Sequence, residues 1–348
     1  MGKQIDLKNY QVRTDLAIEA VEGKTFDGIQ TTNRQVDDLT ITEVTIRDGS
    51  GSTIGKKDGM YVTIEFDDVT DYDNKEKIKR VFTDELNRLL LALEIKEDDT
   101  CMVIGLGNEL STPDALGPKA IDKIIVTKHL ADMDGMTLDE GFKEVSILKP
   151  GVTGSTGIET SLLIQSVVKT VQPDFLIVVD ALASQSINRV NKTIQMTDSG
   201  IHPGSGVGNS RKEISKETIG IPVIAVGIPT VVDAVTIVSD TIDCLEKHYA
   251  YMRDNINDPV MKLTPLSSIN YLKQTNVKEL GNNEKQQLMG VLGSFTSVER
   301  RQLISEVLSP VGYNLMVTPK EIDFVLDKLC DIVGNGINMS LHKKVSHL

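Results

Sequence analysis

The stretch Met102-VIGLGNELSTPDALGPK-Ala120 decides the fold class of this chain. The apolar residues 102–104 predict a strand that runs into a glycine turn at 105–108, because glycine adopts positive φ freely. Asp114 follows this turn and stands directly before a predicted helix. In an open α/β sheet, ligands and catalytic groups gather beyond the carboxyl ends of the strands. Asp114 is therefore placed as a candidate catalytic or ligating carboxylate.

A second carboxylate has the same placement, in Phe175-LIVV-Asp180. The short apolar run predicts a buried parallel strand with Asp180 at its C-terminal tip and a short helix after Ala181. If the two strands are neighbours, Asp114 and Asp180 meet across the crevice. One would then be held protonated and serve as an acid, and the other would stay ionised and serve as a base. The alternative is that each aspartate caps the helix after its strand; two such strand ends together favour function.

Strands and helices alternate over residues 100–248, which predicts an α/β fold with a doubly wound, mostly parallel sheet flanked by helices. Alternating residues at 37–46 and 61–66 predict an extra N-terminal β-rich segment. Residues 251–283 have no clear period and predict an excursion or linker. Helices are also expected at residues 74–93, 283–308 and 319–341, the last two closing the chain.

Composition excludes several classes of protein. A net charge of −13 over 348 residues argues against nonspecific nucleic-acid binding. No apolar run approaches the roughly 18 residues of a membrane span, and the polar N-terminus has no secretory core, so a cytoplasmic protein is expected. Cys101, Cys244 and Cys330 lack metal-ligand spacing and are expected to be buried apolar residues in a reducing compartment.

Two glycine-rich loops, at residues 150–159 and 199–209, could hold a peptide. The second contains His202, a candidate supporting residue. No phosphate-binding loop, G-x-S-x-G elbow, H-E-x-x-H motif or Cys/His dyad is present. The remaining chemistry is hydrolysis by a carboxylate pair, which requires no metal or cofactor, or by a metal held by Asp114, Asp180 and His202. A binding module without catalysis is a third alternative.

Six long segments resemble the germination protease of spore-forming Firmicutes, an endopeptidase family. In this family the core is similar to that of hydrogenase maturation endopeptidases. The proposed catalytic aspartates of the family match Asp114 in Thr-Pro-Asp-Ala and Asp180 in Val-Asp-Ala-Leu, whereas His202 resembles, more loosely, a metal-binding histidine of the hydrogenase-processing relatives. The segments are residues 10–20, 105–120, 173–183, 197–209, 220–234 and 314–323.

The resemblance implies an aspartic-type endopeptidase, made as a zymogen that cuts its own N-terminal segment. It implies that the enzyme starts the degradation of small acid-soluble spore proteins at germination. It also implies a homotetramer, the cytoplasm of the forespore and spore core as location, and no direct contact with nucleic acid or membrane. The expected organisation is a propeptide at residues 1–15 and a single protease domain at residues 16–348.

The resemblance also suggests the activation site. The family's substrates are cut after Glu, in Glu-Ile/Phe-Ala followed by Ser-Glu. Thr14-Asp15-Leu16-Ala17-Ile18-Glu19-Ala20 has a similar pattern and looks like a built-in substrate copy. We therefore expect the cut between Asp15 and Leu16. The alternative is an ordinary flexible tail.

Overall fold

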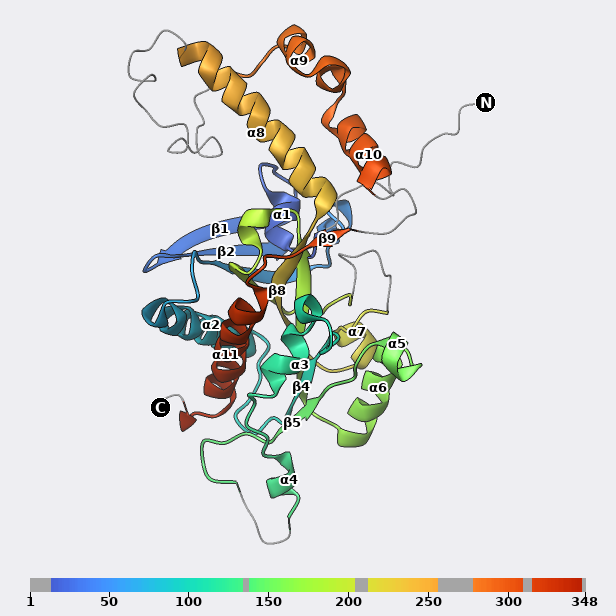
Figure 1. Ribbon diagram of the computed structural model, residues 1–348. Coiled ribbons are helices and arrows are strands. Elements are labelled where there is room, and N and C mark those ends of the chain that lie inside the picture. The colour runs from blue at the N-terminus through green and yellow to red at the C-terminus, as the bar shows by residue number, and fades with distance from the viewer. Residues whose placement is uncertain (1–13, 134–137, 204–211, 256–277, 309–314, 346–348) are drawn as a thin grey trace. The chain divides into compact units, whose positions relative to one another are not determined.

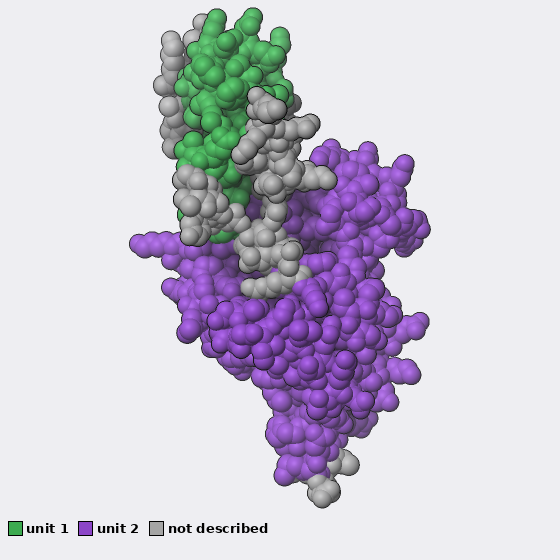
Figure 2. Space-filling view, turned by 90° about the vertical axis from the view of Figure 1, so that its right-hand side faces the viewer, with its two compact units in different colours: residues 1–12, 233–317 green, residues 13–232, 318–348 purple. Residues whose placement is uncertain are grey.

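The computed structural model describes residues 14–133, 138–203, 212–255, 278–308 and 315–345. The chain divides into two compact units (Figure 2). The larger unit comprises residues 13–232 and 318–348, and the smaller unit comprises residues 1–12 and 233–317. The excursion expected at residues 251–283 falls within the smaller unit, and its residues 256–277 lie outside the described part of the chain.

The larger unit is built on one sheet with the strand order β1-β2-β3-β7-β8-β6-β4-β5. Strands β5, β4, β6 and β8 pair in parallel, whereas β1, β2, β3, β7 and β8 pair in antiparallel order. The strands are β1 Ile29–Val36, β2 Leu39–Ile46, β3 Gly59–Glu65, β4 Cys101–Gly105, β5 Val145–Leu148, β6 Phe175–Ser184, β7 Thr193–Thr197 and β8 Val223–Asp233.

The sheet is therefore mixed, and the prediction of a mostly parallel, doubly wound sheet is wrong for half of it. The predicted N-terminal β-rich segment is present, but it is part of the same sheet because β7 pairs with both β3 and β8. The exposed strand β1 was not predicted. Its polar residues carry no hydrophobic alternation, so only its pairing with β2 defines it.

Helices α2, α3 and α11 cover one face of the sheet, and α6 covers the other (Figure 1). The first face holds the larger apolar core, to which each of the strands from β2 to β8 contributes. None of the described helices is long and apolar enough to cross a membrane. The helices of the larger unit are α1 Ala17–Val21, α2 Tyr72–Ala92, α3 Leu116–Ile121, α4 Lys128–Ala131, α5 Thr153–Thr156, α6 Thr160–Val171, α7 Lys216–Ile219 and α11 Ile322–Leu341.

The smaller unit is mainly helical in its described part. Helix α8 begins at Ala234, directly after β8 ends at Asp233. The helix predicted at 283–308 is interrupted by a 3₁₀ turn at Gly290–Ser294. The described elements are α8 Ala234–Asn255, α9 Asn282–Met289, α10 Ser297–Leu308 and β9 Met316–Val317.

Two further predictions of local structure are corrected. The chain after Ala181 is not a short helix: β6 continues to Ser184 and stays paired with β8. The last helix begins at Ile322, not at residue 319 as predicted, and the Thr318 hydroxyl before it donates a hydrogen bond to the carbonyl of Thr230. In both places a tertiary hydrogen-bond partner overrides the local signal.

The cysteines follow the expectation in part. Cys101 and Cys330 are buried, whereas Cys244 is half-buried. Burial raises the pKa of the Cys330 thiol to about 12, which keeps it protonated and unreactive at neutral pH.

We predict that His342 makes the fold sensitive to acid. The ring is fully buried, its Nδ1 accepts a hydrogen bond from Lys143 N at 3.3 Å, and its Nε2 lies 3.2 Å from Ile125 O. Burial lowers its pKa below the usual 6.5. The unfolded chain therefore binds a proton more readily than the folded chain, and stability falls as pH drops below about 6.5. Denaturant unfolding at pH 7 and pH 5 should show a smaller loss of stability for His342→Gln than for the wild type.

The exposed His129 provides the control, because His129→Gln should keep the wild-type pH dependence. An unchanged pH dependence in His342→Gln would show that His342 is not the group responsible.

We predict that Gly117→Ala destabilises the packing of α3 on the strand ends. A Cβ at Gly117 would lie 2.2 Å from Leu106 O and 2.5 Å from Val179 O, which are backbone atoms of the sheet and its turn. Overpacking of this kind costs about 1–3 kcal/mol. The free energy of unfolding in urea should fall by that amount. Gly154→Ala is the matched control, since nothing lies within 4 Å of its Cβ position; an equal effect of the two changes would contradict the packing argument.

Candidate functional site

Asp114 closes a tight turn beyond the end of β4. Its Oδ2 accepts a hydrogen bond from Asn108 N at 2.9 Å, and its carbonyl accepts from the same amide at 3.0 Å. The turn begins at Gly107, which has φ of +113°; a Cβ there would lie 2.0 Å from Asp114 O. Only glycine fits this position, so the Gly-Leu-Gly sequence and Asp114 form one structural feature.

The neighbouring strands fix this turn in place. Leu106 N donates to Val179 O of β6 at 2.8 Å. The buried hydroxyl of Thr230, on β8, donates to Pro113 O at 2.6 Å. The turn that carries Asp114 is thus held by the strand next to β4 and by the strand beyond it.

Asp180 is buried and lies within β6, not at its tip as predicted. Strands β4 and β6 are hydrogen-bonded neighbours, which was the condition for Asp114 and Asp180 to share one crevice. Neither aspartate caps a helix: Asp180 Oδ1 accepts from Ala181 N at 2.9 Å, and α3 has no side-chain cap. The capping alternative is therefore wrong for both, whereas their catalytic role remains a prediction.

His202 is exposed and has its own partner. Its Nε2 lies 3.0 Å from Glu213 Oε2, and Lys57 Nζ lies 2.7 Å from the other oxygen of Glu213. Within the described ranges, no group of three or more His, Cys, Asp or Glu side chains is arranged to hold a metal ion. Asp114, Asp180 and His202 therefore do not form a ligand set in this structure. Residues 204–211 of the adjacent glycine-rich loop lie outside the described part.

The segment around Asp15 and Leu16 is bound to the end of β6. Asp15 N donates to Ala183 O at 3.0 Å, and Ala183 N donates to Asp15 Oδ2 at 2.8 Å. Leu16 is 0 % exposed and packs with Ile18 and Leu182. The flexible-tail alternative does not describe this ordered, buried segment.

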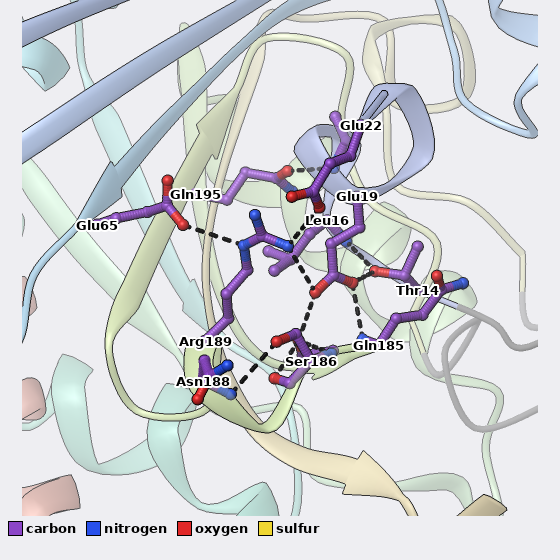
Figure 3. Close-up of polar contacts among 12 residues, drawn as sticks. Thr14, Leu16, Glu19, Glu22, Glu65, Gln185, Ser186, Asn188, Arg189 and Gln195 are labelled. Atoms are coloured by element: carbon purple, nitrogen blue, oxygen red, sulfur yellow. Dashed lines mark hydrogen bonds and ion pairs between the residues drawn. The ribbon is translucent and has the colours of Figure 1, made fainter. Parts of the chain in front are cut away.

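A buried carboxylate anchors the same segment. Glu19, whose side chain is 2 % exposed, accepts hydrogen bonds from Ser184 Oγ at 2.6 Å and Gln185 N at 2.7 Å. Figure 3 shows its carboxylate beside Arg189 and Thr14, and the Arg189 Nη1 lies 3.5 Å from it. A buried acid with this many donors fixes the position of α1 against the loop after β6.

Two half-buried cations complete this cluster. Burial disfavours the charged form of Arg189, but Glu22 and Glu65 outweigh it and raise its pKa. Lys56 Nζ donates to Thr14 O at 2.8 Å, and burial lowers the pKa of Lys56 although Asp15 and Glu19 oppose the shift. No motif pointed to Lys56 or Arg189, because each is defined by contacts with residues distant in sequence.

Comparison with known proteins identifies the family. The family model described as germination protease matches residues 5–347. The chain is 46% identical to a germination protease of Priestia megaterium over 360 residues, which covers 99% of this chain and 97% of the relative. It is 47% identical to the germination protease of Bacillus velezensis and 42% identical to that of a Geobacillus strain, with the same coverage. The chain therefore belongs to the germination protease family.

Proposed function

We propose that this protein is an endopeptidase made as a zymogen that cuts its own chain between Asp15 and Leu16. The mature enzyme then starts the degradation of small acid-soluble spore proteins during germination. Its reaction is aspartic-type, with Asp114 and Asp180 as the carboxylate pair. Membership of a protease family supports the reaction class.

The observation that carries the proposal is the position of the expected cleavage site. The Asp15 backbone is hydrogen-bonded to Ala183, which lies on the same strand as Asp180. Leu16 is in an extended conformation, with φ of −81° and ψ of 128°, before α1 begins at Ala17. An extended peptide bound along a strand is a common mode of peptide recognition. The chain thus holds its own candidate substrate next to a candidate catalytic strand.

In the proposed reaction one aspartate takes a proton from water, and the water oxygen attacks the carbonyl carbon of Asp15. The C–N bond to Leu16 breaks as the other aspartate protonates the leaving nitrogen. The products are a carboxyl group on Asp15 and a free amine on Leu16. A tethered segment has a high effective concentration, which favours cleavage of the protein's own chain.

The substrates, location and assembly belong to the same proposal. Substrates cut after an acidic residue would present the pattern that residues 15–19 carry. We propose that the enzyme works as a homotetramer in the cytoplasm of the forespore and spore core. An assembly of this kind would keep folded cytoplasmic proteins away from the site.

We predict that Asp114→Asn and Asp180→Asn each slow self-cleavage by about 10²-fold or more, because each removes one general acid or base. The measurement is the rate at which purified full-length chain loses its N-terminal segment, with folding checked by circular dichroism. Asp122→Asn is the control, since this exposed aspartate forms a surface ion pair with Lys149. Near-wild-type cleavage in either variant would remove that aspartate from the mechanism. A rate abolished by chelators and restored by a divalent metal would favour a metal-dependent peptidase.

We predict that N-terminal sequencing of the matured protein begins Leu16-Ala17-Ile18-Glu19. Leu16→Lys should slow maturation at least about tenfold, because burying an ammonium group beside Ile18 and Leu182 costs several kcal/mol. Leu91→Lys is the matched control, since Leu91 is exposed on α2. A different mature N-terminus, or equal rates for the two variants, would exclude this cleavage site.

A further inference from the structure

Gln195 contacts both sides of the bond expected to be cut. Its Nε2 donates to the carbonyl of Asp15 at 3.1 Å, and its Oε1 accepts from Ala17 N at 2.6 Å. Because a backbone N–H can only donate, the contact with Ala17 orients the amide so that its NH₂ faces the Asp15 carbonyl. The side chain is buried, so this orientation is fixed. Gln195 is labelled in Figure 3.

The register of the sheet places Gln195 in line with Asp180. Gln195 of β7 is opposite Gly227 of β8, and Gly227 is opposite Asp180 of β6. Residues that are directly opposite on paired strands project from the same face of the sheet. With neighbouring strands about 4.8 Å apart, the backbones at Gln195 and Asp180 are separated by roughly 10 Å.

Gly227 lies between Gln195 and Asp180 on the intervening strand, so no side chain stands between the two. A Cβ there would lie 2.5 Å from Leu182. Asp15 is bonded to Ala183 of β6 on one side and to Gln195 of β7 on the other, so the segment crosses over β8. The carbonyl expected to be attacked therefore lies on the face of the sheet from which both Asp180 and Gln195 project.

We propose that Gln195 is a catalytic residue that stabilises the oxyanion formed on the Asp15 carbonyl. This inference rests on the proposed self-cleavage. Attack by water moves negative charge onto the oxygen that already accepts the Nε2–H bond, and a fixed donor in a buried site stabilises this charge without having to reorganise. The amide stays neutral throughout, so Gln195 moves no proton; the proton transfers remain with the aspartates.

The test compares Gln195→Glu with Glu19→Gln in the full-length protein. Gln195→Glu keeps the side-chain size and the acceptor for Ala17 but replaces the donor that faces Asp15. Glu19→Gln weakens the anchoring of the same segment without touching the carbonyl. Self-cleavage rates are measured together with hydrogen exchange of residues 14–22, which reports how firmly the segment is held.

We expect Gln195→Glu to slow self-cleavage by about 10²–10³-fold at neutral pH, the usual effect of losing one oxyanion donor. Where hydrogen-exchange protection of residues 14–22 is comparable in the two variants, Glu19→Gln should slow self-cleavage much less. The rate of Gln195→Glu relative to wild type should rise as pH falls toward about 4, where a glutamate carboxyl regains its proton and can donate again. If Gln195→Glu fails to fold, Gln195→Met is measured in the same way.

A self-cleavage rate of the Gln195 variant within threefold of the wild-type rate would overturn the inference. A loss of rate no larger than that of Glu19→Gln, at equal hydrogen-exchange protection of residues 14–22, would overturn it as well. Asp114→Asn and Asp180→Asn in the same assay separate this outcome from failure of the proposed function. If the aspartate variants are inactive and the Gln195 variant is active, only the role of Gln195 is rejected. If the aspartate variants still cleave, the carboxylate-pair mechanism itself is rejected.

Discussion

The pairing of β7 with both β3 and β8 is the constraint on which the rest of the larger unit depends. It joins the N-terminal antiparallel strands to the parallel strands that carry the candidate aspartates. Through this one strand, a hairpin near the N-terminus and the core after residue 100 share a sheet and an apolar core. The same strand presents Gln195 toward the N-terminal segment.

The second constraint is that different interactions hold the residues on the two sides of the expected cleavage site, which lies between Asp15 and Leu16. Leu16, Ala17 and Ile18 are buried apolar residues that contribute to the packing of the sheet face. Asp15 forms hydrogen bonds with Ala183 and Gln195. Cleavage between Asp15 and Leu16 would therefore remove a hydrogen-bonded part and retain a packed part, so the matured protein would keep its core.

The buried charges around Glu19 have a cost that the surrounding donors offset. A buried carboxylate is tolerated only when it is paired and hydrogen-bonded. Glu19 meets this condition through Ser184 and Gln185 as well as Arg189, whose side chain is only 15 % exposed. Ser184 ends β6, and Gln185 and Arg189 follow it, so the anchor of the N-terminal segment and the candidate catalytic strand are parts of one structure.

The sequence by itself determined the α/β class, the two apolar strands that lead to Asp114 and Asp180, and the family, because apolar runs, glycine turns and long motifs are local signals. Only the tertiary structure decided that the sheet is mixed, that β6 continues past Asp180 and that β1 is a strand. Strand β1 is defined only by its hairpin pairing with the adjacent β2, whereas the mixed sheet and the length of β6 depend on pairing partners distant in the chain. Because their contacts are also with residues distant in the chain, the sequence alone did not identify Gln195, Lys56 or Arg189 as parts of the candidate site. A glutamine in an alternating strand carries no sign of its function until the register places it opposite Gly227 and beneath residue 15.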